Sequence, residues 1–97
     1  MRLYMLGKGV ARYYRKNVRG NKLASDNLIQ KKLTRNILLA KKYHITDDID
    51  LYLYGNLLIF VGGNIIIYIH NIKRKNILPF KIDKDKYNKL NDVLAIV

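Results

Sequence analysis

Residues 49–72 read IDLYLYGNLLIFVGGNIIIYIHNI. Apolar and β-branched residues fill this stretch, and two pairs, Gly55-Asn56 and Gly62-Gly63, interrupt it. Glycine and asparagine adopt positive φ readily, and two-residue loops of this composition favour the tight turns of β-hairpins. The stretch therefore predicts three antiparallel strands joined by two short turns.

The two turns predict a register in which Tyr52 lies opposite Ile59, and Ile59 lies opposite Ile66. Side chains alternate between the two faces along each strand. One face is then wholly apolar, and we expect it to be the core: Ile49, Leu51, Leu53, Leu58, Phe60, Ile65, Ile67 and Ile69. The other face mixes polar and apolar groups, and we expect function there: Asp50, Tyr52, Tyr54, Asn64, Tyr68 and His70 around Leu57, Ile59, Val61 and Ile66.

The chain is strongly basic, with 19 Lys and Arg against 7 acidic residues and a net charge of +12. Twelve of these cations and only one acid lie in residues 1–46. Charge concentrated in one half is typical of nucleic-acid-binding domains, although lysines face water in most proteins. The chain has no cysteine, which excludes disulfides and thiolate metal sites.

The length of 97 residues predicts one domain over residues 1–97. No apolar run approaches the ~18 residues of a membrane span, and the N-terminus lacks the apolar stretch of a signal peptide. We expect a cytoplasmic protein, or one delivered into the cytoplasm of a target cell. We expect no cofactor, no metal and no membrane partner.

Two basic helices are predicted in the N-terminal half. Val10, Tyr14 and Val18 recur at helical spacing in residues 10–19, and a longer helix, capped by Ser25 or Asp26, is expected over residues 26–43. Cations on these helices are candidate phosphate contacts, with a tyrosine available to stack on a base; the alternative is a solvated basic surface. The candidate nucleic-acid-binding residues are Arg12, Tyr13, Arg15, Lys16, Arg19, Lys31, Lys32 and Arg35.

The remaining segments complete the expected fold. Residues 1–6 fit an edge strand or a helical turn, and residues 77–82 fit a fourth strand that its proline restricts to a sheet edge. Asp83 or Asp85 caps a C-terminal helix, and His44 is expected just past the second helix, near a free carbonyl. The expected fold is α+β: basic N-terminal helices packed on a three- to four-stranded antiparallel meander, plus a C-terminal helix.

Acid–base residues cluster at the end of the third strand of the meander. Cleavage of RNA by its own 2′-hydroxyl needs a base, an acid and a cation near the phosphate, and no metal. His70 could act as base or acid with Tyr68 as its partner; the alternative is a strand histidine without a catalytic role. The candidate catalytic residues are His70, Tyr68, Lys73, Arg74 and Lys81.

Residues 58–82 read LIFVGGNIIIYIHNIKRKNILPFKI. This run resembles the sheet of small ribonuclease toxins of the barnase–EndoU–colicin–RelE group, above all its colicin D-like and RelE-like members. The segment IHNIKRK is similar to the basic, histidine-bearing stretch after the RelE-like hairpin, and Phe80-Lys81 is similar to an aromatic–lysine pair in colicin D-like enzymes. The resemblance implies basic helices on an antiparallel sheet whose open face cuts tRNA or mRNA without a metal.

Three functions are compatible with these residues. The first is a metal-independent endoribonuclease toxin that cleaves tRNA or another structured RNA, and whose inhibitor would be a small acidic immunity or antitoxin protein. The second is a non-enzymatic nucleic acid-binding regulator of phage or plasmid type, with tyrosines as stacking platforms. The third is an interaction protein that buries Leu57, Ile59 and Ile66 against a partner.

Overall fold

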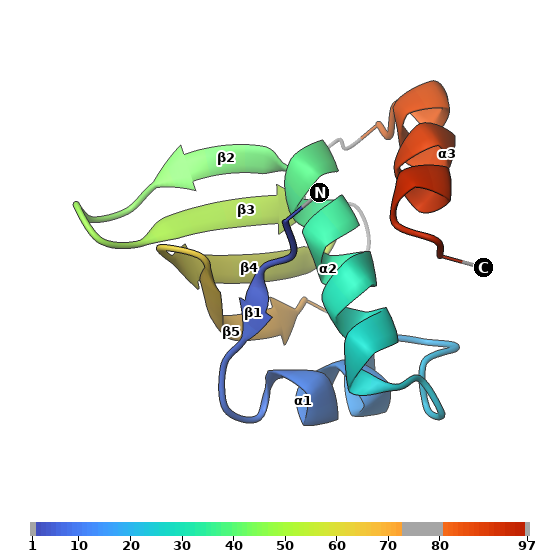
Figure 1. Cartoon of the computed structure of the whole chain (residues 1–97). Helices are drawn as coiled ribbons and strands as arrows, with labels where there is room; N and C mark the ends of the chain where they lie inside the picture. Colours follow the sequence, from blue (N-terminus) through green and yellow to red (C-terminus); the bar gives the residue numbers. More distant parts are fainter. Residues whose placement is uncertain (1, 73–80, 97) are drawn as a thin grey trace.

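The computed structural model describes residues 2–72 and 81–96. A five-stranded mixed sheet, with the strand order β1-β5-β4-β3-β2, carries helices α1 and α2 on one face, and α3 lies beside α2 (Figure 1). The predicted α+β class, with its C-terminal helix, is confirmed. The elements are β1 (Met5–Leu6), α1 (Val10–Asn17), α2 (Asp26–Leu39), β2 (Lys41–His44), β3 (Asp50–Tyr54), β4 (Leu57–Gly62), β5 (Ile65–Asn71) and α3 (Lys84–Val93).

The predicted meander is formed by β3, β4 and β5. The first hairpin has the predicted register, with Tyr52 opposite Ile59. The second turn lies one residue later than predicted, at Gly63-Asn64, so Ile66 pairs with Val61. Gly63 has a φ of 61°, which is the positive φ that the turn requires. The predicted register of the second hairpin is therefore wrong.

A β-bulge in β5 changes which side chains share a face. Ile66 and Tyr68 pair with adjacent residues of β4, so Ile67 is the extra residue between them. An extra residue reverses the alternation of side chains for the rest of the strand. Tyr68 therefore lies beside Phe60, on the face opposite that of Ile66, and His70 follows it there.

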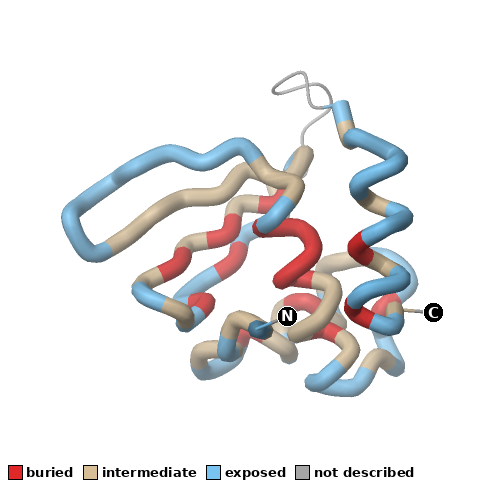
Figure 2. Tube along the Cα trace, turned by 45° about the horizontal axis from the view of Figure 1, so that its top comes forward, coloured by how far each residue is buried: buried red, intermediate tan, exposed pale blue. Residues whose placement is uncertain are grey.

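The helices cover the face that the sequence analysis expected to be open. Five side chains of β4 and β5 are buried there: Leu57, Ile59, Val61, Ile66 and Ile69. They pack against the apolar side chains of α1 and α2: Val10, Tyr14, Ile29, Leu33 and Ile37. Figure 2 shows this buried layer in red in the sheet and the helices. The predicted core face and the predicted exposure of Leu57, Ile59 and Ile66 are both wrong.

The opposite face, which is wholly apolar on β3 and β4, is not covered by any of the three described helices (Figure 1). Leu58 and Phe60 are half-buried there, and Ile65 and Ile67 are 43% and 46% exposed. Strand alternation defines two faces but does not say which one the helices cover, and here both faces are apolar enough to be a core. Exposed apolar surfaces of this kind are typical of interaction sites.

The second helix is shorter than predicted. α2 ends at Leu39, Ala40 has an extended backbone, and residues 41–44 form β2 along the free edge of β3. The prediction of a helix through residue 43 is therefore wrong. Pairing with β3 satisfies backbone groups of these residues, and this outweighs their helix propensity.

The predicted N-terminal caps are confirmed. Ser25 Oγ accepts a hydrogen bond from Leu28 N (3.1 Å), and Asp83 Oδ1 accepts one from Lys86 N (3.2 Å).

Residues 77–80 of the predicted fourth strand lie outside the described residues, and residues 81–82 are not in a strand. No described helix is long and apolar enough to cross a membrane.

Candidate nucleic-acid interface

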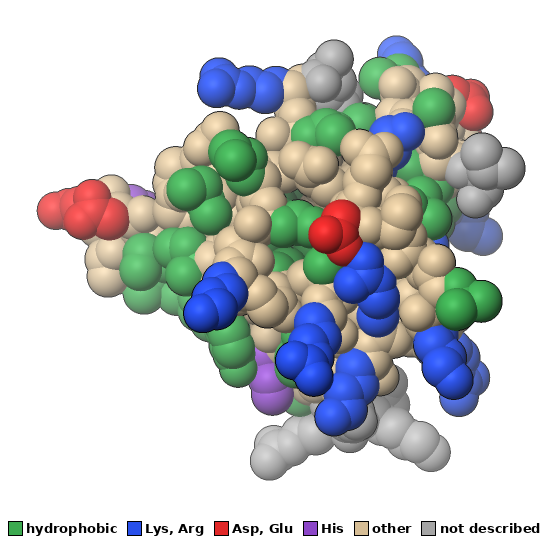
Figure 3. Space-filling model, turned by 60° about the horizontal axis from the view of Figure 1, so that its bottom comes forward, with side chains coloured by type: hydrophobic (Ala, Val, Ile, Leu, Met, Phe, Trp, Pro, Cys, Tyr) green, Lys and Arg blue, Asp and Glu red, His purple; other side chains and the backbone are tan. Residues whose placement is uncertain are grey.

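The basic stripe consists of Arg12, Lys16 and Arg19, which are exposed along the outward side of α1 and the turn after it. The spacing of four residues places Arg12 and Lys16 on one side of α1, and Arg19 lies in the turn that follows the helix. The opposite side buries Val10 and Tyr14 against the sheet. Figure 3, which brings the α1 side forward, shows several Lys and Arg side chains gathered there. These three predicted nucleic-acid contacts are accessible.

The other predicted cations are placed differently. Arg15 forms an ion pair with Asp26 and donates from Nε to the carbonyl of Ala24 (2.7 Å). Lys31 is half-buried on α2, and Lys32 Nζ donates to Asn21 Oδ1 (2.7 Å). Arg35 is buried. The prediction that it contacts phosphate from an outward face of α2 is therefore wrong. The accessible part of the predicted interface is therefore concentrated on α1.

Aromatic side chains of β4 and β5 form a row on the open face. The rings of Tyr68 and His70 are stacked, with centroids 6.4 Å apart and an interplanar angle of 8°. Phe60 pairs with Tyr68 from the neighbouring strand β4, and their ring centroids are 5.7 Å apart. Tyr68 is 52% exposed, so its ring is accessible to a base. Tyr54, which was predicted beside Tyr68, lies on the helix-covered face instead.

Tyr13 joins α1 to the aromatic row. Its hydroxyl accepts a hydrogen bond from Asn71 N (2.9 Å) and lies 3.4 Å from His70 Nδ1. A hydroxyl can donate to a neutral imidazole or accept from a protonated one. The contact uses Nδ1, and no hydrogen bond of the described residues engages Nε2, so this atom can exchange a proton with a ligand.

A groove of about 180 Å³ separates the start of α1 from β5. Lys8, Tyr13 and Tyr68 contribute to its lining, so the groove lies between a cation and the aromatic row. Lys8 is exposed, and the sequence analysis did not single it out because it lies between two glycines and outside any periodic pattern.

Of the three predicted catalytic cations, the structure describes only Lys81, and no contact joins it to His70. Lys81 is exposed just before α3, and Lys73 and Arg74 lie outside the described residues. In the described ranges, no group of three or more His, Cys, Asp or Glu side chains could hold a metal ion.

His44 belongs to an ion-pair cluster on the β2–β3 hairpin. Its Nδ1 is 2.9 Å from Asp50 Oδ1, and Lys42 Nζ is 3.6 Å from Asp50 Oδ2. The hydrogen bond from His44 and the charge of Lys42 hold the pKa of Asp50 below its usual value. The prediction that His44 lies just past the second helix, near a free carbonyl, is therefore wrong, because the residue lies in β2 and pairs with Asp50.

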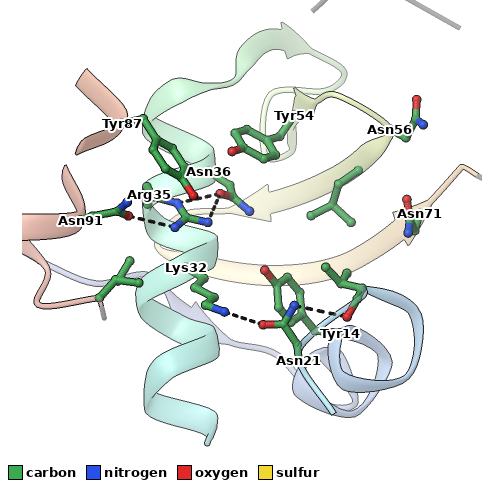
Figure 4. A pocket seen from close by; sticks show the side chains of 13 residues that line it. Tyr14, Asn21, Lys32, Arg35, Asn36, Tyr54, Asn56, Asn71, Tyr87 and Asn91 are labelled. Carbon is green, nitrogen blue, oxygen red and sulfur yellow. Dashed lines mark hydrogen bonds between the residues drawn. The ribbon is translucent and has the colours of Figure 1, made fainter. Parts of the chain in front are cut away.

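A second feature is a polar pocket of about 480 Å³, bounded by α2, α3 and the ends of β3 and β5 (Figure 4). Arg35 and Lys32 line it from α2, and Tyr87 and Asn91 line it from α3. Burial raises the pKa of Tyr54 in its wall, against the opposing effect of the Arg35 charge. The polar pocket was not predicted from the sequence, because most of its residues are separated in the chain.

One signal in the sequence does point to the polar pocket. Asn36 follows Ile29 by seven residues, which is close to two helical turns, so a polar side chain shares the buried side of α2.

The chain matches no curated protein and no solved structure with significant similarity. It matches the family described as YorE over residues 4–93, which is nearly the whole chain. The protein therefore belongs to the YorE family.

Proposed function

We propose that the protein binds RNA along the basic stripe of α1 and the aromatic row of β4 and β5. The observation that carries this proposal is the adjacency of the two surfaces, which the Tyr13 hydroxyl joins through its contacts with Asn71 and His70. Phosphates would contact Arg12, Lys16 and Arg19, and bases would stack on Tyr68 and His70. The combination of a cationic track and exposed rings is typical of proteins that bind single-stranded nucleic acid.

The contribution of stacking is tested with Tyr68→Ala. Base–aromatic stacking contributes about 1–3 kcal/mol per base, so the affinity for a fluorescently labelled unpaired RNA should fall roughly tenfold. Tyr43→Ala is the matched control, because Tyr43 is an exposed tyrosine of the same sheet on the far strand β2. Equal effects of the two substitutions would contradict the proposed position of the bases.

We propose further that the bound RNA is cleaved at His70, which makes the protein a metal-independent endoribonuclease. The exposed His70 has Nδ1 against Tyr13, so Nε2 is the atom that would accept the 2′-hydroxyl proton or protonate the leaving 5′-oxygen. Attack of the 2′-oxygen on phosphorus would give a 2′,3′-cyclic phosphate and a 5′-hydroxyl. Structured RNA such as tRNA, in the cytoplasm, is the proposed substrate, and a small acidic protein is the proposed inhibitor.

Cleavage is tested by incubating the purified protein with total tRNA in EDTA and separating the products on a denaturing gel. We expect discrete fragments that disappear with His70→Ala and decrease with Tyr13→Phe. His44→Ala is the control, because this histidine pairs with Asp50 on another hairpin. Intact tRNA that is retarded on a native gel would leave RNA binding without cleavage. Fragments that persist with His70→Ala would contradict the catalytic role of this residue.

A further inference from the structure

Arg35 is a buried cation whose partners are neutral. It is 7% exposed, and it donates from Nε and Nη2 to Asn36 Oδ1 (3.1 Å each) and from Nη1 to Asn91 Oδ1 (2.9 Å). Its guanidinium carbon lies 4.6 Å from the centre of the Tyr87 ring. Lys32, the second cation of the polar pocket, also has a neutral partner, the side-chain oxygen of Asn21.

The aspartates of the described residues either form ion pairs outside the polar pocket or are exposed. The ion pairs of the described residues join Asp26 to Arg15, and Asp50 to Lys42 and His44. Neither cation of the pocket forms an ion pair with any of these residues. Burying a cation without a negative partner is costly, because neutral amides compensate only part of the lost hydration.

The guanidinium of Arg35 also has unused hydrogen-bonding capacity. It carries five N–H groups, and its hydrogen bonds to the described residues use three of them. The planar guanidinium suits the paired oxygens of a phosphate, and a nearby ammonium adds a second positive charge. An anion bound in the pocket could therefore contact two cations, Arg35 and Lys32.

The size and the walls of the pocket indicate what else the ligand carries. Its volume of about 480 Å³ lies within the range of small-molecule sites and exceeds what a phosphate alone would fill. Tyr54 and Tyr87 supply aromatic rings, and the side-chain amides of Asn36, Asn71 and Asn91 supply donors and acceptors (Figure 4). Rings and amides are the groups that stack on a base and pair with its edge.

We propose that this pocket binds a nucleotide through its terminal phosphate, with Arg35 and Lys32 contacting the phosphate oxygens and a tyrosine ring beside the base. The proposal goes beyond the RNA interface and does not depend on it, because no residue of the basic stripe or of the aromatic row lines the pocket. The terminal phosphate could belong to a free mononucleotide or to the 5′ end of an RNA chain.

Isothermal titration calorimetry of the full chain with AMP, inorganic phosphate and adenosine tests the proposal. AMP should bind most tightly, inorganic phosphate more weakly, and adenosine least, because the cations recognise the phosphate. Arg35→Met and Lys32→Met should each weaken AMP binding roughly tenfold or more, as expected for the loss of a charged hydrogen bond. Lys89→Met is the matched control, because it removes the same charge from an exposed position of α3 that does not line the pocket.

The buried position of Arg35 gives a second readout. Arg35→Met removes a buried charge, but it also leaves the side-chain oxygens of Asn36 and Asn91 without the donors that they have now. Without ligand, the variant should therefore melt at a lower temperature than the wild type, and AMP should no longer raise that temperature. Lys32→Met provides an independent variant at a half-buried position.

Short RNA oligonucleotides with a 5′-phosphate or a 5′-hydroxyl separate the two sources of the phosphate. A 5′-phosphate effect that Lys32→Met removes would assign the pocket to RNA ends, and AMP binding without such an effect would assign it to free nucleotides. The proposal is overturned if AMP and inorganic phosphate do not bind the folded protein at millimolar concentration. It is also overturned if both variants fold and bind AMP as the wild type does.

Discussion

Neighbouring isoleucines in β5 test which face of the sheet is the core. Ile66 is 0% exposed against the helices, whereas Ile65 is 43% exposed on the open face. Replacing isoleucine by alanine removes roughly three carbon groups, at about 0.8 kcal/mol each when they are buried. For Ile66, the residual cavity adds to this, so Ile66→Ala should lower the free energy of unfolding by about 3–4 kcal/mol. Ile65→Ala should lower it by about 1 kcal/mol or less.

Urea denaturation followed by circular dichroism measures both changes. In a domain of this size, 1 kcal/mol shifts the melting temperature by about 4–8 °C, so Ile66→Ala should lower it by more than about 10 °C. Ile59→Ala and Leu58→Ala repeat the comparison on β4, where Ile59 is buried and Leu58 is only half-buried. If Ile65→Ala were the more destabilising change, the assignment of the core face would be refuted.

Three further substitutions test local features of the fold. Ser25→Ala removes the cap of α2 and should lower the unfolding free energy by about 1 kcal/mol in urea denaturation; no change would contradict the capping role. Gly7→Ala would place a methyl group 2.5 Å from the carbonyl oxygen of Ile66, so the same assay should show a loss of about 1–3 kcal/mol, and a neutral result would contradict this close approach. The lowered pKa of Asp50 stabilises the fold above the unfolded value of 3.8, and this contribution is lost as pH falls through the folded pKa. Asp50→Asn should therefore reduce the fall in melting temperature from about pH 5 to pH 3, and an unchanged pH dependence would show that Asp50 makes no such contribution.

The three strands of the meander and the caps of α2 and α3 could be predicted because local sequence determines them. The turn at Gly55-Asn56 determines the register of the first hairpin, and the residues before α2 and α3, Ser25 and Asp83, supply their caps. The second hairpin was not predictable to the residue, because Gly62, Gly63 and Asn64 all suit a turn. The β-bulge at Ile67 has no clear sequence signature, since isoleucines on both sides fit either register.

The inversion of the core face has a different cause. The alternation of side chains along a strand predicts which residues share a face. Which face is covered depends on where α1 and α2 pack, and helix packing is a tertiary property that the strand pattern does not contain. The bulge, not this inversion, separates Tyr54 from Tyr68: it places Tyr68 and His70 on the open face, whereas Tyr54 lies on the helix-covered face. The basic stripe was predictable from helical spacing, but the burial of Arg35 was not, because it depends on the docking of α3.

RNA binding by α1 is tested most directly by fluorescence anisotropy of a labelled 5′-hydroxyl RNA over a series of salt concentrations. The test variant is Arg12/Lys16→Ala, and the control is Lys84/Lys89→Ala, which removes two exposed cations from α3. Each lost phosphate contact should reduce the slope of log affinity against log salt by about 0.7 for a single strand. We predict weaker binding and a slope reduced by roughly 1.4 for the α1 variant alone. Equal losses in the two variants, or no binding by the wild type at low salt, would contradict the proposed interface.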